Sequence, residues 1–223
     1  MKTDVIKKVK KPWPTKAVME QIYKAKLWGD NEEGFYSGEG SHLPGLVKPY
    51  VDSIQSLLKS FERPLTVIDM GCGDFNVGWQ LVNFTKKYIA IDIVSDLIEF
   101  NRNKYQYPNL EFYCLDIVND NLPTADCIIL RQVLQHLSNS EIKSIVAKLY
   151  DYQYIVLTEH LPSEKFTPNI DIISGQGTRL RKQSGVNLCK APFYLKVKES
   201  KQLLCLNSPN YGGQLVTTMF KMF

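Results

Sequence analysis

The stretch LTVIDMGCGDFNVG, residues 65–78, constrains the fold of this chain more than any other feature. A run typical of a buried strand, LTVIDM, is followed at once by Gly71 and Gly73 and then by residues 76–85, which we predict to be helical. Glycine lacks a Cβ atom, so the backbone can turn tightly there and approach a ligand closely. This order of strand, glycine turn and helix is typical of the first unit of a parallel α/β sheet.

Short apolar runs and amphipathic segments alternate along the rest of the chain, as βα units require. Helices are predicted at 15–28, 45–61, 94–104 and 141–150, the last opened by a capping box of Ser138 and Glu141. Strands are predicted at 65–70, 88–92, 111–115, 126–130, 154–158, 193–205 and 214–222. We therefore expect an α/β fold, a doubly wound open sheet whose final strand pair forms an antiparallel edge.

Charge is unevenly distributed behind the formal net value of +4. Residues 1–16 hold six lysines and one acid, acidic side chains outnumber basic ones over 17–178, and basic side chains dominate from 179 onward. The lysine tail lacks the interleaved aromatic residues of a nucleic-acid stacking platform. We predict a disordered tail and regard nucleic acid as an unexpected partner.

Targeting and cysteine patterns favour a cytoplasmic protein. No apolar run reaches the roughly 18 residues of a membrane span, and no apolar h-region follows the lysines to make a signal peptide. The five cysteines are widely spaced and form no CxxC pair, so we predict reduced thiols, without disulfides or a zinc site.

Three carboxylates follow three successive strands. Asp69 ends the first strand, Asp92 the next, and Asp116 follows the third. Asn76 occupies the place of the third glycine in a dinucleotide-binding turn, which argues against a pyrophosphate ligand. A carboxylate at Asp92, 19 residues after Gly73, can accept both hydroxyls of a ribose. Three acids at one edge suit a cationic ligand that carries a ribose and an adenine amine.

Four linked segments, VIDMGCGDFNVG, AIDI, CLDI and ADCIILRQVLQHLS, together resemble the motifs of the class I S-adenosylmethionine-dependent methyltransferases. The resemblance covers about residues 65–160 by motif and extends to 223 by strand order. It implies a seven-stranded sheet, mostly parallel with one antiparallel C-terminal strand, helices on both faces, and S-adenosylmethionine as the cofactor. The methyl transfer that this resemblance implies requires no metal.

Carried over by position, the resemblance places Gly71 and Gly73 against the methionine part of the cofactor, with Asp69 organising that loop. Residues expected to contact the cofactor are Asp69, Gly71, Cys72, Gly73, Asn76, Asp92, Ile93, Asp116, Ile117 and Arg131.

The same comparison assigns the nucleoside half of the cofactor. Asp92 would hold the ribose hydroxyls and Ile93 would pack on the adenine. Asp116 would accept a hydrogen bond from the adenine amine, with Ile117 nearby.

Candidates for acid–base chemistry are few. Methyl transfer from a sulfonium depends largely on positioning, and a general base adds typically 10²–10⁴-fold for a hydroxyl acceptor. All three histidines, His42, His136 and His160, fall in loops predicted at the binding end of the sheet. His136 fits the role of base and equally that of a residue bonded to the next helix start. Glu159 and His160 end the fifth strand, where either would bind an acceptor hydroxyl or cap the loop.

Two irregular segments are candidates for the acceptor pocket. In FYSGEGSH, Tyr36, Ser41 and His42 are expected to line a lid over the site, the alternative being a surface loop anchored by aromatics. In GTRLRKQSG, Arg179 and Arg181 would clamp a phosphate or carboxylate, or form a solvated basic loop. The expected organisation is a basic flexible tail (1–14), an N-terminal helical and lid segment (15–62), and a methyltransferase domain (63–223) with an acceptor-binding insertion at about 160–192.

We therefore expect an O-methyltransferase of a small anionic or sugar-like metabolite. The loops and the Lys, Asn and Tyr usage are loosely similar to methyltransferases that accompany bacterial surface-glycan synthesis. Methylation of RNA or protein is the alternative, and a non-catalytic cofactor-binding or interaction protein on the same fold is the second. Neither the acceptor nor the oligomeric state follows from the sequence.

Overall fold

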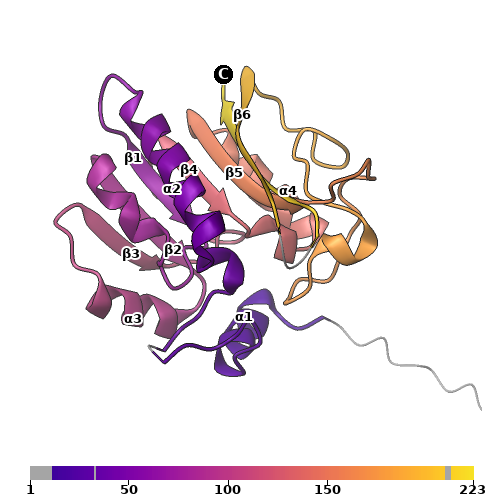
Figure 1. Ribbon diagram of the computed structural model, residues 1–223, viewed down its shortest axis with the longest axis horizontal. Coiled ribbons are helices and arrows are strands. Elements are labelled where there is room, and N and C mark those ends of the chain that lie inside the picture. The colour runs from indigo at the N-terminus through magenta and orange to yellow at the C-terminus, as the bar shows by residue number, and fades with distance from the viewer. Residues whose placement is uncertain (1–11, 33, 209–211) are drawn as a thin grey trace, which may run out of the picture.

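A seven-stranded sheet forms the centre of the molecule, in the order β3-β2-β1-β4-β5-β7-β6 (Figure 1). This computed structural model describes residues 12–32, 34–208 and 212–223, so most of the predicted tail lies outside the described residues. Strands β1 to β5 run parallel, and β7 is antiparallel to both β5 and β6. The strands are β1 (Thr66–Met70), β2 (Lys87–Asp92), β3 (Leu110–Cys114), β4 (Cys127–Arg131), β5 (Tyr154–Leu161), β6 (Glu199–Asn207) and β7 (Gln214–Lys221). The predicted α/β sheet with an antiparallel C-terminal edge is confirmed.

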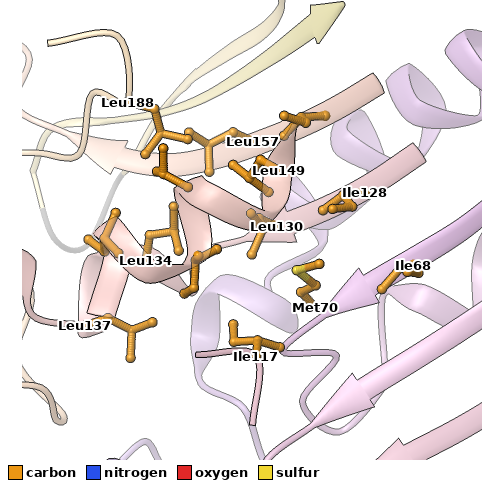
Figure 2. Close-up of a cluster of buried hydrophobic side chains, with 14 of the residues drawn as sticks. Ile68, Met70, Ile117, Ile128, Leu130, Leu134, Leu137, Leu149, Leu157 and Leu188 are labelled. Carbon is orange, nitrogen blue, oxygen red and sulfur yellow. The ribbon is translucent and has the colours of Figure 1, made fainter. Parts of the chain in front are cut away.

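Helices cover both faces of the sheet because successive strand residues point to opposite sides. They are α1 (Thr15–Lys24), α2 (Pro44–Lys59), α3 (Ser95–Lys104) and α4 (Asn139–Leu149). Ile68, Met70 and Leu130 belong to the cluster that contains the buried face of α4, part of which Figure 2 shows. Val67 and Ile129 pack with α2 in a second cluster. Each such buried aliphatic side chain contributes about 1.5–3 kcal/mol.

The start of α4 matches the prediction in detail. The Ser138 side chain accepts from the main-chain N–H of Glu141, and the Glu141 carboxylate accepts from the N–H of Ser138 at 3.1 Å, which completes the capping box. In α2, which begins at Pro44, Pro49 lies inside the helix.

The prediction of a helix at 76–85 is wrong. Two short 3-10 helices, Gly78–Gln80 and Val82–Phe84, replace it. Phe75 has a φ of 62° and turns its fully buried ring into the core. That ring occupies the space where a Cβ on Gly78 would lie, so the chain stays in tight turns here.

The strand predicted from 193 begins only at Glu199. Phe193 and Leu195 are buried in the core from an irregular segment, so their apolar character reflects loop anchoring and not a place in the sheet. Among the described residues, no helix has the length and apolar character needed to cross a membrane.

Candidate functional site

A cavity of about 700 Å³ lies at the carboxyl ends of the parallel strands. Asp69 of β1, Asp92 of β2, Arg131 of β4 and His160 of β5 all line it. Residues of α1, which lies beyond the strand ends in Figure 1, close the opposite side. Parallel α/β sheets bind ligands at this edge.

The glycine turn forms the floor of the cavity. The main-chain N–H groups of Gly71 and Cys72 both donate to the carbonyl of Ile91, at 2.8 and 2.9 Å. Gly71 and Gly73 have φ values of 75° and 56°, a region that favours glycine. A Cβ on Gly73 would collide with the hydroxyl of Ser37, so the turn also packs directly against the N-terminal segment.

Asp92 holds this turn in place. Its Oδ2 accepts from the N–H of Gly73 and its Oδ1 from the N–H of Val94, each at 3.1 Å. Burial raises the pKa of Asp92, while these main-chain donors oppose the rise. A carboxylate has about four acceptor positions, so Asp92 can still accept from a ligand.

The residues expected from the sequence to contact adenine, Ile93, Asp116 and Ile117, line the same cavity as Asp92. Asp116 Oδ1 accepts from the N–H of Val118 at 2.8 Å, and Oδ2 accepts from the Asn119 side chain at 2.7 Å. These bonds fix the orientation of the Asp116 carboxylate.

Asp69 and Arg131 both line the cavity, and the charge of Arg131 acts on the Asp69 carboxyl. Burial raises the pKa of Asp69 to about 7, against the opposing effects of the Tyr88 hydroxyl, which donates to Oδ2 at 3.0 Å, and of the Arg131 charge. Arg131 donates from Nη2 to the carbonyl of Gly40 at 2.6 Å and from Nη1 to the hydroxyl of Ser41 at 3.2 Å. Its buried Nε has no hydrogen-bond partner among the described residues.

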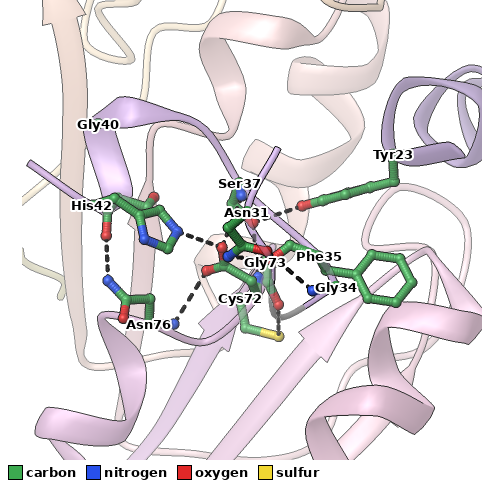
Figure 3. A network of polar contacts seen from close by, with 12 residues as sticks. Tyr23, Asn31, Gly34, Phe35, Ser37, Gly40, His42, Cys72, Gly73 and Asn76 are labelled. Atoms are coloured by element: carbon green, nitrogen blue, oxygen red, sulfur yellow. Dashed lines mark hydrogen bonds and ion pairs between the residues drawn. The ribbon is translucent and has the colours of Figure 1, made fainter. Parts of the chain in front are cut away.

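A polar network joins the N-terminal segment to the glycine turn (Figure 3). The N–H of Ser37 donates to Asp74 Oδ2 at 2.8 Å, and the N–H of Asp74 donates to the hydroxyl of Ser37 at 2.7 Å. The hydroxyls of Ser37 and Tyr23 lie 2.9 Å apart. Asn76, which does not line the cavity, donates from Nδ2 to the carbonyl of Ser41 at 2.7 Å. Ser41 itself does line it.

His136 lines the cavity as a neutral imidazole. Its Nδ1 lies 3.1 Å from the carbonyl of Gly175, and since a carbonyl only accepts, Nδ1 carries the proton. Nε2 then accepts from the Gln135 amide at 3.2 Å. Burial lowers the pKa of His136 to about 4. The ring of Trp28 packs 5.1 Å from the imidazole, centroid to centroid.

His42 and Tyr36 lie away from the cavity that they were expected to line. His42 Nε2 is 2.6 Å from Asp74 Oδ2, and its ring stacks on Tyr36 with centroids 4.2 Å apart. Asp74 lines the cavity, so His42 supports it from behind.

Of the two candidate residues at the end of β5, one lines the cavity and the other does not. His160 lines the cavity, its Nε2 donates to the carbonyl of Gly212 at 2.6 Å, and burial lowers its pKa. Glu159 is buried and does not line it; its Oε1 accepts from the N–H of Leu134 at 3.1 Å. Burial raises the pKa of Glu159 to about 8, although the charge of Arg179 opposes the rise.

Of the two candidate arginines, likewise, only one lines the cavity. Arg181 is exposed and lines the cavity. Arg179 does not line it: the side chain is buried and bonded to the main chain, so the structure gives it no contact with the space where an acceptor would lie.

Several lining residues were not singled out from the sequence. Tyr23 and Trp28 reach the cavity from α1 and the turn after it, and Asp74 from the glycine turn. In the sequence, these residues could have been found only by position. Asp74 directly follows Gly73, and Trp28 lies at helical spacing from Ile22 and Ala25.

Comparisons with known proteins agree with this architecture. Residues 67–152 match the family model of a methyltransferase domain. The chain is 26% identical over 118 residues to phosphoethanolamine N-methyltransferase 3 of Arabidopsis thaliana, covering 46% of this chain and 24% of that protein. It is 31% identical over 106 residues to malonyl-[acyl-carrier protein] O-methyltransferase of Bacillus anthracis, covering 44% and 39%. The matches thus span well under half of the length of these curated relatives.

Solved structures show the same fold at low sequence identity. The N-methyltransferase NodS of Bradyrhizobium japonicum, in complex with S-adenosylhomocysteine, has a TM-score of 0.66 and 12% identity, over 92% of this chain and 98% of that one. The magnesium protoporphyrin IX methyltransferase ChlM of Synechocystis, with bound S-adenosylmethionine, has a TM-score of 0.60 and 16% identity, over 96% and 100%. The sheet order and the solved structures therefore show the fold of the class I S-adenosylmethionine-dependent methyltransferases, and residues 67–152 of this fold match a methyltransferase-domain model.

Proposed function

We propose that this chain binds S-adenosylmethionine and transfers its methyl group to a small-molecule acceptor. The observation that carries the proposal is Asp92, whose carboxylate ends β2, lines the cavity and fixes the Cβ-free glycine turn. A carboxylate at this position suits the two ribose hydroxyls. Ile93 and Ile117 would flank the adenine, and Asp116 would accept from its amine.

The methionine half of the cofactor fits the other end of the cavity. Gly71 and Gly73 let the main chain approach it, and the unpartnered Nε of Arg131 is a buried donor beside the turn. Burying a donor without a partner costs about 1–3 kcal/mol, which a cofactor carboxylate would relieve. Asp69 and Asp92 favour a positively charged ligand here. When bound, the cofactor supplies an activated methyl group.

We further propose that the acceptor is an anionic or sugar-like metabolite methylated on oxygen, in the region lined by Gln135, His136, His160 and Arg181. His136 is neutral, and its acceptor nitrogen Nε2 is bonded to the Gln135 amide, so it would act as a general base once the acceptor hydroxyl replaces that amide. Arg181 is an exposed cation that can bind a phosphate or carboxylate. In this proposal residues 15–62 act as a lid and 160–192 as the acceptor-binding insertion. Because the curated relatives include an N-methyltransferase, transfer to nitrogen is the second candidate.

Calorimetric titration with S-adenosylmethionine tests the cofactor first. We expect saturable binding by the wild-type protein, and its absence would refute the proposal. Incubation of metabolite extracts with methyl-labelled cofactor then tests transfer. Labelled products that are anionic and that Arg181→Gln makes more slowly, with unchanged cofactor affinity, would support the acceptor assignment. Label found only in RNA or protein would refute it.

A further inference from the structure

Four consecutive carbonyls follow β4, those of residues 134–137, and all four accept from one distant segment. Arg179 donates from Nη1 to the first two carbonyls, at 3.0 and 3.4 Å, and from Nη2 to the fourth, at 2.8 Å. The third carbonyl, that of His136, accepts from the N–H of Gly175 at 2.9 Å. The segment 175–179 thus holds the main chain that carries His136.

The Arg179 side chain has no donor left for other partners. Its Nε donates to the carbonyl of Ile170 at 3.1 Å, and Nη2 also donates to Asn139 Oδ1 at 2.7 Å, so all five N–H groups are used. The residue is 1% exposed, and among the described residues it makes no ion pair within 4 Å. A buried guanidinium is costly to desolvate, and here hydrogen bonds to main-chain oxygens offset that cost.

Two further contacts hold the same turn. Glu159 accepts from the N–H of Leu134, and the Nδ1–H of His136 donates to the carbonyl of Gly175. The 3-10 turn Leu134–His136 is therefore bound through its first N–H, through its carbonyls and through one ring. Its side chains Gln135 and His136 line the cavity, whereas Arg179 does not.

We propose that Arg179 is a positioning residue, which fixes the turn at 134–137 so that Gln135 and His136 face the acceptor. We call the hydrogen bonds from Arg179 to the carbonyls of this turn the clamp. The clamp is observed within this chain, whereas its effect on the acceptor rests on the proposed function. Only arginine fits, because a lysine has three donors on one atom and cannot reach carbonyls in two directions with a planar fork.

The tautomer of His136 reports on the clamp, because a ring nitrogen keeps its proton according to the hydrogen bond it makes. The experiment compares nitrogen spectra of histidine-labelled wild type, Arg179→Lys and Lys182→Gln at pH 7. Lys182 lies on the same short helix, is exposed and contacts only the carbonyl of Asp171 through its ammonium group, so it is the matched control.

We expect wild type and Lys182→Gln to show His136 protonated on Nδ1 alone, and Arg179→Lys to show a mixture of both tautomers, with the His42 signals unchanged. Cofactor affinity by calorimetry should change less than about threefold, since the clamp does not touch Asp92. A wild-type His136 pattern in Arg179→Lys would overturn the proposal.

A second measurement needs no variant and decides the matter if Arg179→Lys does not fold. In native wild type the Nη groups of Arg179 should give separate, slowly exchanging signals, and one averaged signal would overturn the clamp. A wild-type protein with the expected His136 and Arg179 signals but without cofactor binding would refute the proposed function alone.

Discussion

The main-chain N–H of Gly73 donates to Oδ2 of Asp92 across 3.1 Å, so a carboxylate that lines the cavity also holds the glycine turn. Asn101 supports the same turn from the other side, where its Nδ2 donates to the carbonyl of Gly73 at 2.7 Å. Loss of the Asp92 carboxylate therefore removes a ligand contact and loosens the turn together.

Replacing Asp92 by alanine should weaken S-adenosylmethionine binding by about 100-fold or more. Hydrogen bonds to a charged group contribute about 1.5–3 kcal/mol each, and 1.4 kcal/mol corresponds to a factor of ten. Isothermal calorimetry measures the change. Asp96→Asn is the control, because Asp96 is exposed on the first turn of α3, and its affinity should stay within twofold of wild type. Equal affinities for wild type and Asp92→Ala would contradict the site assignment.

Gly73→Ala should destabilise the protein by about 1–3 kcal/mol, because φ is 56° there and the added Cβ meets the Ser37 hydroxyl. Thermal unfolding followed by circular dichroism measures this. Gly45→Ala is the matched control: nothing lies within 4 Å of its Cβ position, and it sits in α2. It should stabilise by about 0.5–1 kcal/mol. If both variants changed stability alike, steric exclusion at Gly73 would be the wrong explanation.

Glu159→Gln should flatten the loss of stability as pH rises from about 5 to 8. In the native protein burial raises the pKa of Glu159 to about 8, from 4.5 when unfolded. Between these values the native state binds more protons than the unfolded state, so stability falls as pH rises, by up to about 1.4 kcal/mol per pH unit. Urea titrations from pH 5 to 8 measure the slope. Part of the slope should remain in the variant, because burial also raises the pKa of Asp69, to about 7. An unchanged slope would show that Glu159 is ionised in the native state.

His136→Asn should reduce acid sensitivity. Burial lowers the pKa of His136 to about 4 in the native state, against 6.5 when unfolded. Here the unfolded state binds more protons, so stability falls as pH drops from about 6.5 to 4 and levels off below. The difference between variant and wild type in urea titrations over this range isolates the residue, since His160 contributes to both. Parallel curves would mean that His136 is protonated in the native protein.

Ser37→Ala should loosen the N-terminal segment. It leaves the N–H of Asp74 without the hydroxyl that accepts from it and removes the contact with Tyr23, at a cost of about 1–3 kcal/mol. Amide hydrogen exchange should rise in residues 15–42. Ser56→Ala, which loses only an exposed bond to the carbonyl of Asp52, should leave exchange there as in wild type. Equal exchange in the two variants would argue against Ser37 as the link.

The first three strands were predictable because a buried parallel strand reads as an apolar run that stops near a polar residue. Asp69, Asp92 and Asp116 needed no more than that, and all three line the cavity. The helix expected at 76–85 failed for the opposite reason. Phe75 and Gly78 determine the turns there through a contact in the folded core, which no local pattern contains. The fifth strand, predicted to end at 158, instead continues through Glu159 and His160 to Leu161.

Arg179 illustrates the other limit. Three cationic residues in GTRLRKQSG suggest a solvent-facing anion site, and periodicity offers nothing against it. What decides the role of Arg179 is a turn more than 40 residues earlier in the chain, whose carbonyls converge on it. His42 was predicted to line the cavity because the glycine-rich segment FYSGEGSH suits a lid, and its bond to Asp74 instead holds it outside the cavity.

The packing of Trp28 against His136, with ring centroids 5.1 Å apart, joins the end of the α1 segment to the turn after β4. It also gives the protein an intrinsic optical reporter. The other tryptophans, Trp13 and Trp79, are 63% and 40% exposed, and both can be replaced by phenylalanine. Indole emission in such a protein comes from Trp28 alone, so its intensity would report any separation of this segment from the turn that carries His136.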